Sequence, residues 1–265
     1  MRRVIAGLFA LVVVAAPTPA DAWGFEAHKY ILDRAIDLLP PEIRPYFVKY
    51  RAAIVEHAID PDLWRNVGFD ADESPRHFLD MDAYGSSPFT ELPRDFEAAV
   101  KRYGREFIVK NGLLPWRTQE IHAKLVEAFT QKATYSRDNI KYFSAFLGHY
   151  LSDAQVPFHA ALNHDGQLTG QWGIHSRFET ETFERYRGSL DVRPKPIVAV
   201  TSARDFAFDS LLQQPPDGAH AALHELVLQI DHHHRDAFLG DFLGNAAAHV
   251  AGTDDDLGQV RGQHH

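Results

Sequence analysis

The stretch KYFSAFLGHYLSDAQVPFHAA, residues 141–161, has the apolar spacing of a helix that is buried in a protein core. Phe146 and Leu147 lie three and four residues after Phe143, the spacing of one helix face. Pro157 cannot continue that helix, because it lacks a backbone N–H and its ring clashes with the preceding turn. The stretch therefore predicts a core helix that ends shortly before Pro157.

The same helix carries candidate metal-binding side chains. His149 and Asp153 are four residues apart and project from one face, and His159 follows in the turn. GIHSRFETE repeats this spacing with His175 and Glu179. Buried histidine and aspartate are costly unless they are paired or bind a metal, and both are zinc ligands. Taken alone, either pair could also be a structural ion pair or a solvated contact on a helix face.

Helical periodicity extends through nearly the whole chain. The predicted helices cover residues 30–39, 96–109, 119–129, 138–152, 174–186, 203–212 and about 219–248. Residues 197–200 are the one short candidate strand, and residues 60–84 and 156–172 are predicted to be irregular and functional. We therefore expect an all-α fold, a single compact multi-helix domain.

The amino terminus has the layout of a secretory signal peptide. Arg2 and Arg3 precede an apolar run that is too short to span a membrane, and Ala20-Asp21-Ala22 is a cleavage motif. Cleavage after Ala22 makes Trp23 the first mature residue; an uncleaved anchor is the alternative. We expect residues 1–22 to be the signal peptide and 23–265 to be the domain, with roughly the last twelve residues disordered. The location is then periplasmic or extracellular.

Composition points to metal as a source of stability and function. The chain has no cysteine, 16 histidines and a net charge of −9. An exported protein without disulfides is held together by its core or by bound metals. Its acidity disfavours nonspecific binding to duplex nucleic acid, which requires clustered lysine and arginine.

The segments HYLSDAQVPFHAA and GIHSRFE resemble the core of the zinc-dependent phospholipases C. These enzymes share a fold and a three-zinc site with the zinc-dependent single-strand nucleases. The resemblance implies an all-α phosphoesterase with three zinc ions, the first of them held partly by the amine and carbonyl of the amino-terminal residue. The implied ligands are Trp23, His28, Asp60, His77, His149, Asp153, His159, His175 and Glu179.

The resemblance also implies how such a site hydrolyses a phosphodiester. Paired metals generate a bridging hydroxide near neutral pH, and the third withdraws charge from the phosphoryl group. Asp60 is the candidate general base, although it could instead cap a helix that begins at Pro61. The candidate substrate-binding residues are Glu26, Arg76, Phe78 and Asp80.

The motifs favour lipid over nucleic acid as the substrate. His175-x₃-Glu179 is similar to the phospholipase branch, whereas the short Trp23-x₄-His28 spacing is similar to the nuclease branch. We therefore expect a phospholipase C-type phosphodiesterase that contacts a membrane surface transiently and has no stable protein partner. The alternatives are a single-strand nuclease of the same fold, with Phe78 stacking on a base, and a non-catalytic periplasmic zinc-binding protein.

Overall fold

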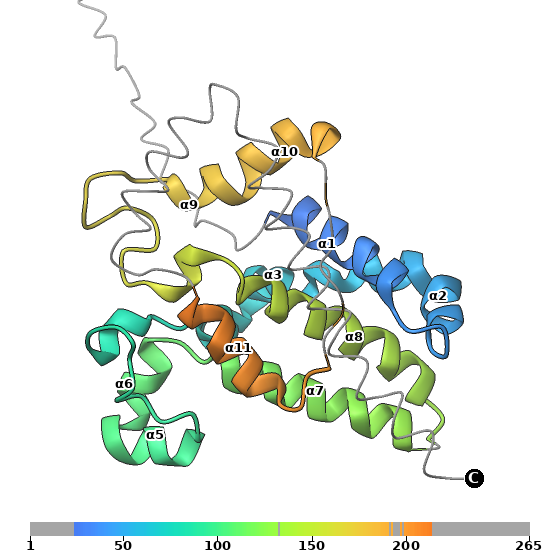
Figure 1. Cartoon of the computed structure of the whole chain (residues 1–265), viewed down its shortest axis with the longest axis horizontal. Coiled ribbons are helices and arrows are strands. Elements are labelled where there is room, and N and C mark those ends of the chain that lie inside the picture. Colours follow the sequence, from blue (N-terminus) through green and yellow to red (C-terminus); the bar gives the residue numbers. More distant parts are fainter. Residues whose placement is uncertain (1–23, 132, 191, 193–196, 198, 214–265) are drawn as a thin grey trace, which may run out of the picture.

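The computed structural model describes residues 24–213, apart from positions 132, 191, 193–196 and 198. These residues form helices and no strand, and an isolated bridge pairs Leu79 with Gly112. The predicted all-α class is therefore confirmed (Figure 1). The signal peptide, Trp23, the predicted helix over 219–248 and the chain end lie outside the described residues.

The longer helices and the short helical turns alternate along the chain. The α-helices are α1 (Phe25–Leu38), α2 (Arg44–Glu56), α3 (Asp60–Trp64), α4 (Asp70–Glu73), α5 (Phe96–Tyr103), α6 (Arg105–Lys110), α7 (Leu114–Thr130), α8 (Ser136–Asp153), α9 (Ile174–Ser176), α10 (Phe183–Tyr186) and α11 (Ala203–Leu212). The 3₁₀ and π turns are η1 (His57–Ile59), η2 (Arg65–Phe69), η3 (Ser74–Arg76), η4 (Met81–Tyr84), η5 (Pro157–Ala160), η6 (Arg177–Thr182) and η7 (Arg187–Ser189).

Most predicted helices correspond closely to observed ones, and the exceptions have local causes. The helix predicted over 96–109 is divided into α5 and α6 at Gly104, whose φ of 86° does not fit a right-handed helix. The segment 60–84, predicted to be irregular, consists largely of short helical turns. Ile197, Ala199 and Val200 form no strand.

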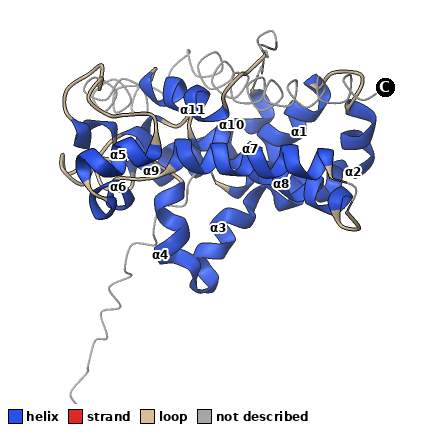
Figure 2. Cartoon of the chain, turned by 90° about the horizontal axis from the view of Figure 1, so that it is seen from below, coloured by secondary structure: helices blue, strands red, loops and turns tan. Residues whose placement is uncertain are grey.

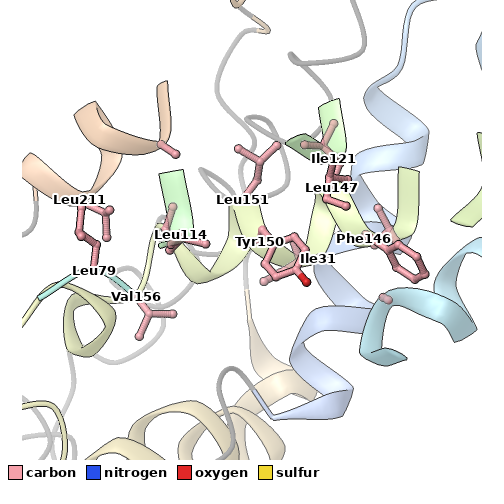
Figure 3. Close-up of a cluster of buried hydrophobic side chains, with 14 of the residues drawn as sticks. Ile31, Leu79, Leu114, Ile121, Phe146, Leu147, Tyr150, Leu151, Val156 and Leu211 are labelled. Atoms are coloured by element: carbon pink, nitrogen blue, oxygen red, sulfur yellow. The ribbon is translucent and has the colours of Figure 1, made fainter. Parts of the chain in front are cut away.

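Helix α8 lies at the centre of the described fold. Every residue of its second half, from Ser144 to Asp153, is buried, as expected for a helix with neighbours on all sides. It packs against α7, α1 and α2 (Figures 1 and 2). Figure 3 shows Tyr150 and Leu151 of α8 among the apolar side chains of this core. The His149 and Asp153 side chains are thus carried by the fully buried half of α8.

Two further segments close around the end of α8. Helices α3 and α4 form a bent projection from the body of the molecule (Figure 2). The bend is at Gly68, whose φ is 99°. At the start of α1, Gly24 lies against η6, because a Cβ on Gly24 would come within 2.6 Å of Thr180 Oγ1. The beginning of the described chain therefore contacts the segment that carries Glu179.

Candidate metal centre

The last turns of α8 collect buried histidines and carboxylates from elements far apart in the sequence. Every one of these side chains is at most 7% exposed or is wholly buried. They are His28 (α1), Asp62 (α3), His77 (after η3), His149 and Asp153 (α8), His159 (η5), His175 (α9) and Glu179 (η6). Their potential ligand atoms form three groups, and within each group these atoms lie within 4.8 Å of one another.

The first group contains His28, His149 and Asp153. Nε2 of His28 lies 3.5 Å from Oδ1 of Asp153, and its ring stacks on that of His149 with centroids 4.0 Å apart. On its far side, Nδ1 of His28 is hydrogen-bonded to Oγ of Ser152 at 2.8 Å. The outer contact fixes the ring so that Nε2 faces the carboxylate.

The second group contains Asp62, His77 and His149. Nδ1 of His77 lies 3.1 Å from Nε2 of His149, 3.1 Å from Oδ2 of Asp153 and 3.6 Å from Oδ1 of Asp62. The other nitrogen of His149, Nδ1, lies 2.8 Å from the carbonyl oxygen of Ala58, to which it can only donate. Nε2 of His149 therefore points into the group and offers its lone pair to a metal once its proton is lost.

The third group contains His159, His175 and Glu179. Nε2 of His175 lies 2.9 Å from Oε2 of Glu179, and Nε2 of His159 lies 3.5 Å from Oε1 of the same carboxylate. Nδ1 of His159 lies 3.7 Å from Oδ1 of Asp153. Asp153 is thus adjacent to all three groups and connects them.

Burial and mutual charge set the protonation of this centre. Burial lowers the pKa of His28 and His159 well below the usual value, and lowers that of His175 to about 4. Burial opposes the charge of His149 too, but the Asp153 and Asp62 carboxylates outweigh it and raise its pKa to about 9. Most of these imidazoles are therefore neutral near pH 7, with lone pairs free for a cation.

The donor set fits zinc. Several buried polar atoms have no hydrogen-bond partner in the described structure, including His28 Nε2, both oxygens of Asp62, Oδ1 of Asp153 and Nδ1 of His159. Leaving so many polar atoms unsatisfied is costly, and bound cations would satisfy them. Imidazole nitrogen and carboxylate oxygen are the ligands that zinc uses when thiolate is absent.

Asp60, the expected ligand and general base, does not enter this cluster. Its Oδ2 lies 2.8 Å from Nδ1 of His57, and its side chain is 24% exposed. Asp62 is wholly buried and faces His77 instead. Because residues two apart on a helix project about 200° apart, only one of these aspartates can face the core. In the segment Asp60-Pro61-Asp62, the DPD motif, the geometry therefore places Asp62 rather than the predicted Asp60 among the candidate ligands.

The expected substrate-binding residues do not form one cluster. Glu26 is exposed and accepts a hydrogen bond from Arg187 at 2.8 Å. The backbone oxygen of Phe78 accepts from Leu114 N at 3.1 Å, and the side chain is half-buried. Burial and the neighbouring Asp82 raise the pKa of Asp80 to about 7.

Arg76 lines a pocket that the sequence did not predict. This pocket has a volume of about 380 Å³ and lies beside the second group. Its lining residues are Trp64, Phe69, Asp72, Glu73, Arg76 and Arg117. Arg76 donates to Oε2 of Glu73 at 2.8 Å, so its charge is partly neutralised there.

Comparison with known proteins agrees with this donor set. A family model described as zinc-dependent phospholipase C matches residues 27–198. No curated protein and no solved structure matches the chain. The matched residues include every member of the three groups. Among the described residues, no helix is long and apolar enough to cross a membrane.

Proposed function

Because the family match covers more than half of the chain, the protein belongs to the zinc-dependent phospholipase C family, and we propose that it is an exported trinuclear phosphodiesterase that hydrolyses phospholipids. The family implies zinc and the hydrolysis of phosphodiester bonds. The observation that carries the proposal is the set of three buried donor groups joined by Asp153.

The proposed ligand set assigns one zinc ion to each group. His28, His149 and Asp153 belong to the first group, to which the resemblance adds the amine and carbonyl of Trp23. Asp62 and His77 complete the second, and His159, His175 and Glu179 form the third. Export by cleavage after Ala22 would expose that amine, so amino-terminal sequencing of the secreted protein should begin at Trp23.

The residues would divide the chemistry among them. Bound zinc ions supply Lewis acidity and lower the pKa of water. Asp62 takes the role that the sequence assigned to Asp60, accepting at a carboxylate oxygen the proton of the attacking water. Burial raises the pKa of Asp62, which favours its acceptance of a proton. The surrounding buried side chains exclude bulk solvent, which strengthens these electrostatic interactions.

Two exposed apolar side chains on a loop beside the third group support a lipid substrate. The loop 161–173 joins the segments of His159 and His175, and its Leu168 and Trp172 are 72% and 66% exposed. Asn163 holds the loop in shape by accepting from Leu168 N at 2.7 Å. The loop contains no lysine or arginine. An exposed tryptophan and leucine on an ordered loop suit transient contact with a zwitterionic lipid surface.

A three-substrate comparison tests the proposal. The chain beginning at Trp23 is loaded with zinc and assayed on phosphatidylcholine, phosphatidylinositol and single-stranded DNA. We expect release of diacylglycerol from at least one lipid. Cleavage of the DNA alone would instead establish the nuclease alternative. Zinc binding without turnover of any substrate would establish a non-catalytic zinc-binding protein.

A further inference from the structure

We infer that Glu73 orients His77 for metal binding, acting through the ring nitrogen that faces away from the metal centre. Nδ1 of His77 faces the second group, 3.1 Å from Asp153 and 3.6 Å from Asp62. The opposite nitrogen, Nε2, lies 3.7 Å from Oε1 of Glu73. Glu73 thus stands directly behind the ligand. This inference rests on the proposed zinc centre.

Glu73 is itself held firmly in place. It is 2% exposed, although it lies on the short helix α4 of the projecting segment. The Tyr150 hydroxyl donates to its Oε1, Arg76 Nη1 donates to its Oε2 at 2.8 Å, and Arg117 Nη2 lies 3.7 Å from Oε2. A buried carboxylate that is surrounded by donors on both oxygens has little freedom to move.

The two carboxylate oxygens of Glu73 face different partners. Oε2 faces the two arginines, which line the outer pocket of about 380 Å³. Oε1 faces Tyr150 and Nε2 of His77. The carboxylate therefore lies between the outer pocket and the buried side chain of His77. The two arginines balance the charge of this carboxylate on the pocket side.

A carboxylate in this position has two effects on a ligating histidine. At 3.7 Å the contact is an electrostatic one rather than a hydrogen bond, and it favours the tautomer that keeps its proton on Nε2, which leaves the lone pair on Nδ1 facing the metal centre. It also makes Nδ1 a stronger donor. The Tyr150 ring adds steric restraint, since it packs edge-on against both His77 and His149, with ring centroids 5.5 and 5.3 Å apart.

The test is zinc affinity in Glu73→Gln, measured at pH 7 by competition with a chromophoric chelator. We expect one bound zinc ion to be weakened by roughly 10- to 100-fold while the other two keep their affinity. The visible spectrum of the cobalt-loaded protein should change at the same site. Tyr150→Phe removes only the hydroxyl group that donates to Glu73. It should weaken binding of the same zinc ion by a smaller factor.

Glu120→Gln is the matched control. Glu120 accepts from Arg117 at 2.9 Å, as Glu73 does from Arg76, but its side chain is 56% exposed. This variant should keep all affinities within about twofold and keep the cobalt spectrum, as is usual for an exposed pair. An equal loss in both variants, or equal weakening of all three ions in Glu73→Gln, would overturn the inference and leave Glu73 a purely structural residue.

Zinc binding and hydrolysis by the unaltered protein distinguish a failure of this inference from a failure of the proposed function. If the unaltered chain binds no zinc, the proposed function and the inference both fail. If it binds zinc and hydrolyses phospholipid, while Glu73→Gln matches it in affinity and spectrum, the inference alone fails.

Discussion

The same four-residue spacing gives two electrostatically opposite pairs in this molecule. His149 lies on the long helix α8 between two carboxylates, and its pKa rises to about 9. His175 lies on the short helix α9, where burial dominates and lowers its pKa to about 4. Asp153, the partner of His149, lies next to all three groups, whereas Glu179, the partner of His175, belongs to one. The four-residue spacing therefore determines which side chains meet, and the burial and charge around each pair determine the pKa of its histidine.

The largest expected effect comes from removing one histidine of each pair in turn. His149→Ala should lose the zinc ion bound by Nε2 and weaken the ion of the adjoining group, because Nε2 of His149 lies where two groups meet, whereas His175→Ala should lose one ion only. Loss of several kcal/mol of charge stabilisation predicts a fall of about 1000-fold or more in phosphatidylcholine hydrolysis for His149→Ala. Metal analysis and initial rates provide the measurement. Equal zinc loss in the two variants would show that the two histidine pairs contribute equally to zinc binding.

A second comparison sets the two aspartates of the DPD motif against each other. Asp62→Asn should lower kcat/KM by about 100-fold or more, because a buried ligand and proton acceptor is lost. Asp60→Asn removes only the contact with His57, so we expect a change within about threefold. Zinc content should fall in the first variant alone. The reverse order would restore Asp60 to the ligand set.

These two residues also show where sequence reasoning stops. The helical class, the core position of α8 and the meeting of His149 with Asp153 follow from periodicity and spacing, because those are properties of one helix. The choice between Asp60 and Asp62 depends on the direction in which α3 leaves η1, which is a tertiary property. Glu73 was missed because its contacts with Tyr150 and Arg117 join residues far apart in the chain.

The two histidines should also give opposite pH dependences of stability in the metal-free chain. The folded pKa of His175 is lowered, so the unfolded chain binds its proton first, and stability falls as pH drops from about 6.5 to 4. The raised pKa of His149 stabilises the fold fully below pH 6.5, and that stability is lost as pH rises to about 9. Each shift corresponds to about 3 kcal/mol.

Urea unfolding in the presence of chelator, from pH 4 to 9, measures both slopes. His175→Gln should flatten the acid side, where His28 and His159 still contribute, and His149→Gln should flatten the alkaline side. Identical profiles for the two variants would contradict the assigned directions.

The smallest expected effect concerns the loop between His159 and His175. Replacing Leu168 and Trp172 by alanine should weaken binding to phosphatidylcholine vesicles about tenfold, since both side chains are exposed and apolar. Hydrolysis of a monomeric short-chain lipid should stay within about twofold. Tyr135→Ala, at another 70% exposed aromatic, is the control. Equal vesicle binding in all three proteins would remove the loop from the lipid contact.

The hydrogen bond between His28 and Ser152 joins residues 124 positions apart in the chain. Closing a loop of this length costs conformational entropy before the contact can stabilise the fold. We therefore expect the first donor group to assemble after α1 has docked onto the end of α8. Zinc uptake at this group should then report the last step of folding. In a stopped-flow experiment, zinc binding should lag behind the appearance of helix.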